Sequence, residues 1–152
     1  MHDITYNLIL FIASFLIWIM ILCAIILWFF SKRRQHKVLV AIFFTILIAV
    51  FISQLIKSFF PYARPFELYN LSPITLTFPK DSSFPSTHAA VAFALAFSLN
   101  SYYKKYAFWF FICAMFVGIG RIVSNVHFLG DVAGGVLVGY LANKIRILLR
   151  IS

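Results

Sequence analysis

Five long apolar segments constrain the fold of this chain more than any other feature. They cover about 5–30, 38–57, 86–103, 106–122 and 131–149. Because a transmembrane helix needs roughly 20 predominantly apolar residues, each segment is about long enough to cross a bilayer. A chain of 152 residues that is 63% hydrophobic and only 11% charged has more apolar surface than a soluble core of this size could bury. We therefore expect an all-α fold, a polytopic membrane helical bundle of about five transmembrane helices, in a single domain over residues 1–152.

Basic residues are concentrated at one set of segment ends. If all five segments cross the membrane, nine of the thirteen Lys and Arg residues fall on one side: Lys32, Arg33, Arg34, Lys37, Lys104, Lys105, Lys144, Arg146 and Arg150. The positive-inside rule assigns that side to the cytoplasm. We therefore expect a multi-pass protein of the cell membrane with an external N-terminus, an external 58–85 connection and a cytoplasmic C-terminus. The net charge of +9 is then a topology signal that also suits anionic lipid headgroups, and it does not predict nucleic-acid binding.

Three of the remaining cations lie at the same membrane boundary as the 58–85 connection. This connection contains all five prolines, so a helix through it is not expected. Lys57 and Arg64 lie at its start, and Arg121 ends the fourth segment. Cations at a membrane boundary are costly and mark functional sites, and guanidinium groups suit phosphate oxygens. Since only four acids share this face, the three cations predict a phosphate or diphosphate ligand.

Two histidines lie at predicted helix boundaries on the same side. Asp131 follows His127 by four residues, a spacing that brings the carboxylate near the ring in a helix or tight turn. A carboxylate on one ring nitrogen fixes the tautomer and leaves the other nitrogen free to attack. The pattern predicts His127 as a nucleophile.

The second histidine, His88, follows Pro85-Ser86-Thr87 at the start of the third segment. Proline favours a first helical turn, and Ser83 or Ser86 could cap it. The free backbone N–H groups at such a helix end form a cradle for an anion. We therefore expect Ser86 and Thr87 to contribute to phosphate binding, with His88 placed as a proton donor.

These residues resemble the three signature motifs of the type 2 phosphatidic acid phosphatase (PAP2) superfamily. The motifs are Lys57-x6-Arg64-Pro65, Pro85-Ser86-Thr87-His88 and Arg121-x5-His127-x3-Asp131, and they span residues 57–131, about half of the chain. Two positions depart from the commonest pattern. Thr87 stands where glycine is frequent, and Gly120 stands where serine usually precedes the arginine. The second departure removes one possible hydrogen bond to phosphate.

The resemblance implies a PAP2-like helical core and a metal-independent two-step reaction without a cofactor. His127 would attack phosphorus to form a phosphohistidine, with Asp131 orienting it. His88 would protonate the leaving oxygen and then activate water. Lys57, Arg64, Arg121 and the Ser86 region would stabilise the equatorial oxygens. The two cysteines, Cys23 and Cys113, fall in apolar segments and lack metal-site spacing.

The substrate is less constrained than the chemistry. The compact length and external site resemble short bacterial bacitracin-resistance-type undecaprenyl-diphosphate phosphatases, which favours a lipid diphosphate. Phosphatidate or phosphatidylglycerophosphate phosphatase, lipid phosphotransferase, and a small transporter or scaffold with a vestigial site stay open as alternatives. Glycines 130, 134, 135 and 139 indicate close helix packing, either within the monomer or in a dimer, so the oligomeric state is open.

Overall fold

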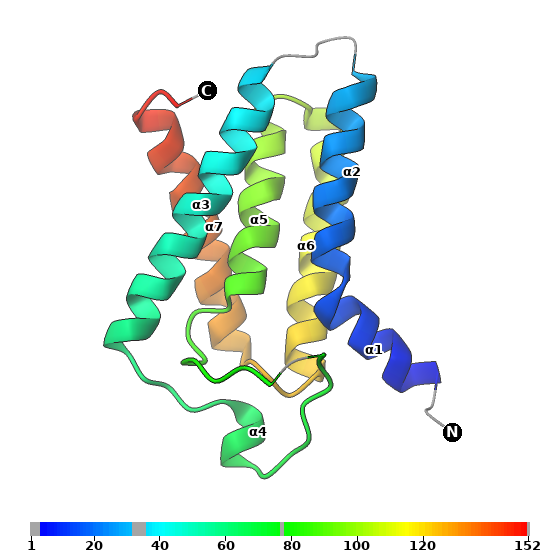
Figure 1. The fold of residues 1–152 in the computed structure, drawn as a ribbon, viewed down its shortest axis with the longest axis vertical. Coiled ribbons are helices and arrows are strands. Elements are labelled where there is room, and N and C mark those ends of the chain that lie inside the picture. Colours follow the sequence, from blue (N-terminus) through cyan, green and yellow to red (C-terminus); the bar gives the residue numbers. More distant parts are fainter. Residues whose placement is uncertain (1–3, 32–35, 77, 152) are drawn as a thin grey trace.

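The computed structural model describes residues 4–31, 36–76 and 78–151. This part of the chain is all-α, as predicted, with seven helices: α1 (Ile4–Ser14), α2 (Leu16–Phe30), α3 (His36–Phe59), α4 (Pro65–Leu68), α5 (Thr87–Asn100), α6 (Lys104–Val123) and α7 (Leu129–Leu148). Figure 1 shows the five longer helices side by side as a bundle, with α1, α4 and the α3–α5 connection at one end. The predicted cations Lys32, Arg33 and Arg34 lie outside the described residues.

Each predicted apolar segment is helical, but the helices differ in their ability to cross a membrane. The first segment forms two helices, α1 and α2, which bend by 54° at a break. By length and hydropathy α3 and α6 can each span a membrane, as can α1 and α2 if the pair is one span, so the described residues contain two to three candidate spans. Helix α5 has only 14 residues, and α7 carries Asp131, Lys144 and Arg146.

Helix α5 forms the centre of the bundle because its sequence is apolar on every side. Most of its residues are buried, and it packs against α2, α3, α6 and α7. Glycines of α7 allow the closest approach: a Cβ added to Gly135 would lie 2.6 Å from the Ser86 carbonyl oxygen, and one added to Gly139 would lie 2.7 Å from that of Ala90. These two glycines therefore serve packing within the monomer, the first of the two interpretations offered for them.

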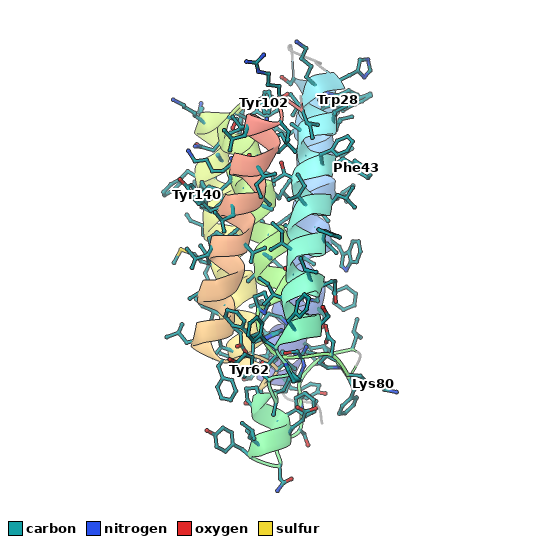
Figure 2. All side chains as sticks on the ribbon, turned by 90° about the vertical axis from the view of Figure 1, so that its left-hand side faces the viewer. Trp28, Phe43, Tyr62, Lys80, Tyr102 and Tyr140 are labelled. Carbon is teal, nitrogen blue, oxygen red and sulfur yellow. The ribbon has the colours of Figure 1, made fainter. Side chains whose placement is uncertain are left out.

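The outside of the bundle is covered by large apolar side chains. Phe43 and Phe51 of α3 are 61% and 65% exposed, and Trp109 of α6 is 64% exposed. Figure 2 shows such side chains projecting along the length of the bundle between Trp28 at one end and Tyr62 at the other. An apolar surface of this extent is typical of a protein that contacts lipid.

The α3–α5 connection folds across the ends of α6 and α7. Its backbone is tied to the α6–α7 turn by Phe66 N–H to the Asn125 oxygen (3.1 Å) and Ile74 N–H to the Ser124 oxygen (3.0 Å). Ser86 N–H likewise donates to the Asp131 oxygen at 2.9 Å. The connection contains the short helix α4, which the proline content did not predict. It begins at Pro65, because proline is tolerated in a first helical turn.

Candidate active site

Side chains from α3, α5, α6 and the two connections at this end of the bundle converge on one cavity. The cavity has a volume of about 230 Å³. Its lining includes six of the residues predicted from the sequence and three others: Lys57, Arg64, Thr87, His88, Arg121 and His127, with Gln54, Pro79 and Asp81. The structure thus brings the predicted cations and both histidines together.

His127 and Asp131 form a pair at the start of α7. His127 is 2% exposed, and its Nδ1 lies 3.4 Å from Asp131 Oδ2, a distance longer than that of a good hydrogen bond. Asp131 Oδ2 also accepts from the backbone N–H of Phe128 at 2.8 Å and from the Ser83 hydroxyl. An acidic residue in the third position of a helix commonly accepts the N–H of the capping residue, so local helix geometry fixes this carboxylate.

The contacts of His127 indicate its tautomer. Its Nε2 lies 3.3 Å from Nη1 of Arg64, and a guanidinium nitrogen can only donate. Nε2 is therefore the unprotonated nitrogen, and Nδ1–H points towards Asp131. Burial lowers the pKa of His127 to about 4, with Arg121 and Arg64 acting in the same direction and Asp131 opposing them. The ring is neutral at pH 7, and the electron pair on its Nε2 accepts from Arg64 Nη1.

Asp81 bridges two of the predicted phosphate-binding cations. One carboxylate oxygen lies 2.7 Å from Arg64 Nη2, and the other lies 2.9 Å from Lys57 Nζ. Partial burial acts to raise the pKa of Asp81, but Lys57 and Arg64 bind the charged form and hold it below its ordinary value. The sequence interpretation counted Asp81 among the four acids of this face and gave it no role. Its position seven residues before His88, in a chain so poor in acids, was the available signal.

Arg121 reaches the cavity from the last turn of α6. The side chain is buried, and Nη1 donates to the carbonyl oxygen of Ala13 at 3.1 Å. Its Nε is also buried and has no hydrogen-bond partner in the part of the chain that the structure describes. Arg121 therefore has a donor available for a ligand.

The start of α5 supplies the third side of the site. Ser86 caps the helix, its hydroxyl accepting from the N–H of Ala89 at 3.5 Å, and it is fully buried. The cavity lining includes Thr87 and His88 but not Ser86. The predicted contribution of Ser86 to phosphate binding is thus indirect in this geometry, through the helix end that it caps.

A second, apolar cavity of about 270 Å³ adjoins the polar one. It is lined by residues of α2, α3 and α5: Ile17, Trp18, Ile21, Ile46, Val50, Thr87, His88 and Val91. Thr87 and His88 belong to both linings. The polar cavity and the apolar one thus share part of their wall at the start of α5.

Neither cysteine lines these cavities. Cys23 is exposed on α2, and Cys113 is partly buried on α6. Among the described residues, no group of three or more His, Cys, Asp or Glu side chains could hold a metal ion.

Comparison with known sequences identifies the family of this chain. Residues 38–149 match the model of the PAP2 superfamily. The chain is 29% identical over 136 residues to "Putative undecaprenyl-diphosphatase YbjG" of Escherichia coli (strain K12), covering 89% of this chain and 68% of that protein. It is 27% identical over 133 residues to "Bacitracin transport permease protein BcrC" of Bacillus licheniformis, covering 87% and 65%. The chain thus spans about two thirds of the length of these relatives.

A solved structure shows the same arrangement of helices. The crystal structure of LpxE from Aquifex aeolicus superimposes with a TM-score of 0.74 at 26% sequence identity, covering 96% of this chain and 85% of that one.

Proposed function

The chain belongs to the PAP2 superfamily of membrane phosphatases, and we propose that it hydrolyses an isoprenyl diphosphate, undecaprenyl diphosphate in particular. The observation that carries the proposal is the pair of adjoining cavities. One is lined by three cations and two histidines, the other by apolar side chains, and they meet at Thr87 and His88. A ligand that fits both has an anionic headgroup and a hydrocarbon chain. The name of the Escherichia coli relative refers to the same substrate.

In the proposed reaction Nε2 of His127 attacks the terminal phosphorus. The N–P bond forms as the bridging P–O bond breaks, and His88 donates a proton to the leaving oxygen. Water, deprotonated by His88, then cleaves the phosphohistidine, which releases inorganic phosphate and restores His127. Asp131 stabilises the charge that develops on the His127 ring, since it already faces Nδ1.

The cations stabilise the equatorial oxygens of the transferring group. Lys57 and Arg64 now bind Asp81, and phosphate oxygens would take over those contacts. Arg121 contributes through Nε, and the N-terminal end of α5 contributes through its backbone N–H groups. Preorganised donors of this kind supply most of the rate enhancement in phosphoryl transfer.

We propose that the apolar cavity holds the part of the isoprenyl chain nearest to the phosphates. Its wall between α2 and α3 carries Ile17, Trp18 and Val50, and Trp18 is 66% exposed. A chain leaving the site along this wall would continue into the lipid that surrounds the bundle. The substrate then needs no movement out of the membrane.

We also propose that all five apolar segments cross the membrane, with α1 and α2 acting as one span. The site would then lie on the external side and the C-terminus in the cytoplasm, because the cations of the α5–α6 turn and of the end of α7 lie at the opposite end of the bundle from the site. This orientation gives the enzyme access to a diphosphate exposed on the outer face.

The test is phosphate release from purified lipids in detergent. The panel holds undecaprenyl diphosphate, phosphatidate and phosphatidylglycerophosphate, each with wild type and with His127→Ala. We expect release from undecaprenyl diphosphate at the highest kcat/KM and none from the variant. A preference for either glycerolipid would refute the substrate, and product found on an added lipid acceptor would indicate a phosphotransferase.

One relative supports a different function. The name of the Bacillus licheniformis protein describes a transport permease. A transporter needs a path through the membrane but no nucleophile, so wild type and His127→Ala would be equally active in transport. Loss of both phosphate release and biological activity in His127→Ala would favour the enzyme.

A further inference from the structure

The last turn of α1 contacts the phosphate site through Arg121. Ala13 is 1% exposed, and its carbonyl oxygen accepts the hydrogen bond from Arg121 Nη1 at 3.1 Å. Helix α1 ends at Ser14, and carbonyl groups in a last helical turn have no partner further along the same helix. A guanidinium at this end also interacts favourably with the helix dipole. Arg121 thus caps α1 from a helix more than 100 residues later in the chain.

Gly120 allows this approach. A Cβ placed on it would lie 2.7 Å from Cγ2 of Ile12, and 3.1 and 3.2 Å from backbone atoms of Ala13 and Ile12. Any side chain at position 120 would therefore push α1 away from α6. This is the position at which the motif usually carries serine. The chain lacks that hydroxyl, and in its place the backbone of α1 lies against the residue before Arg121.

Within the site proposed above, we propose that α1 is a positioning element for Arg121, which it holds through the Ala13 carbonyl group. Nη1 is engaged by Ala13, so the guanidinium can present its other edge, Nε and Nη2, to phosphate oxygens. Nε is buried and has no partner in the part of the chain the structure describes, as expected for a donor that a ligand satisfies. Ordering the long arginine side chain before the substrate arrives removes that entropy loss from the binding step.

The inference predicts that a change at Gly120 acts only through Arg121. Gly120→Ala should lower kcat/KM for the lipid substrate by about tenfold, since a hydrogen bond to a charged group is worth about that much or more. In an Arg121→Lys background, where the guanidinium edge is already gone, the same change should cost less than about twofold. Gly120→Ala should likewise weaken orthovanadate inhibition more when position 121 is Arg than when it is Lys.

The matched control is Gly118→Ala on the same helix. Its added Cβ would lie 2.7 Å from Cγ1 of Val132 on α7, so it overpacks α6 to a similar degree without touching α1. Its effect on kcat/KM should be the same with Arg121 or Lys at position 121. Ile12→Ala removes the side chain that Gly120→Ala meets first, so the double variant Ile12→Ala/Gly120→Ala should recover at least part of the activity.

Two outcomes separate this inference from the proposed function. If wild type hydrolyses the lipid but Gly120→Ala and Arg121→Lys lower kcat/KM independently, α1 does not act through Arg121 and the inference is wrong. If wild type hydrolyses none of the lipids, the proposed function is wrong. In that case orthovanadate binding, measured by thermal shift, would test the inference by itself. Non-additive effects of Gly120→Ala and Arg121→Lys on the orthovanadate affinity would support the inference, and additive effects would overturn it.

Discussion

Replacing Asp81 by Asn tests how the site is arranged before a substrate binds. Five protein acceptors face the five N–H donors of Arg64: the carbonyl oxygens of Asp81, Ser82 and Val126, the Asp81 carboxylate and His127 Nε2. A phosphate oxygen can reach Arg64 only by displacing one of them. The Asp81 carboxylate is the natural one to leave, because its side chain is 45% exposed.

The size of the effect follows from the two contacts of Asp81. Hydrogen bonds to charged groups contribute about 1.5–3 kcal/mol each. Because the carboxylate is partly exposed, solvent screens both ion pairs, and Asn would keep a weaker bond to Arg64. We therefore take about 1.4 kcal/mol as the free energy by which the Asp81 carboxylate competes with a bound anion and which Asp81→Asn removes. This corresponds to roughly tenfold tighter binding of an anion. The pKa of Asp81 lies below its ordinary value, so the carboxylate is charged at neutral pH and the competition is present there.

The assay is inhibition by orthovanadate and by inorganic phosphate at pH 7 in detergent. We expect both inhibition constants to fall about tenfold in Asp81→Asn. The melting temperature should fall as well, because two buried cations lose the negative charge that faces both of them. Glu67→Gln is the matched control. It removes one negative charge from the same connection. Among the described residues, however, the Glu67 side chain accepts from the backbone N–H of Arg64, at 2.7 Å, and not from the Arg64 side chain. Weaker inhibition in Asp81→Asn, or an equal gain in Glu67→Gln, would refute the reasoning.

Four further predictions concern the chemistry and the topology. His127→Ala should abolish turnover, whereas His88→Ala should retain phosphorylation by an aryl phosphate, because a good leaving group partly replaces a general acid; equal activity of the two variants would contradict these roles. Burial lowers the pKa of His127 to about 4, so the neutral form dominates above that value, and kcat/KM should fall on the acid side only near pH 4 rather than near 6.5. Turnover should survive EDTA, and a loss that added metal reverses would overturn the histidine-nucleophile mechanism. In intact cells an impermeant thiol reagent should label Ser82→Cys and not Gln35→Cys, and the opposite pattern would invert the protein.

The helices, and the convergence of the candidate site residues, were predictable from the sequence for one physical reason. Unpaired polar groups are costly in a bilayer, so long apolar segments predict helices, whose backbone groups are all paired. For the same reason, the few charged residues at the helix ends predict a functional site. The structure brings Lys57, Arg64, His88, Arg121 and His127 to one cavity, as expected from their shared side in the charge-derived topology. The number of spans was less accessible, because α5 is short and central and its burial depends on neighbours rather than on its own length.

The features that the sequence left hidden all depend on contacts between distant segments. No Gly or Pro marks the break between α1 and α2, which follows Ser14 within a continuous apolar run. The carbonyl groups freed at such a break need a donor, and in this fold Arg121 supplies one to Ala13. That contact requires a residue without a side chain at position 120, so the departure of Gly120 from the usual motif and the bend in the first apolar segment are two sides of one packing arrangement. The role of Gly120 and the bend in the first apolar segment could not be predicted from the sequence, because the sequence motif does not show that the end of α1 packs against position 120.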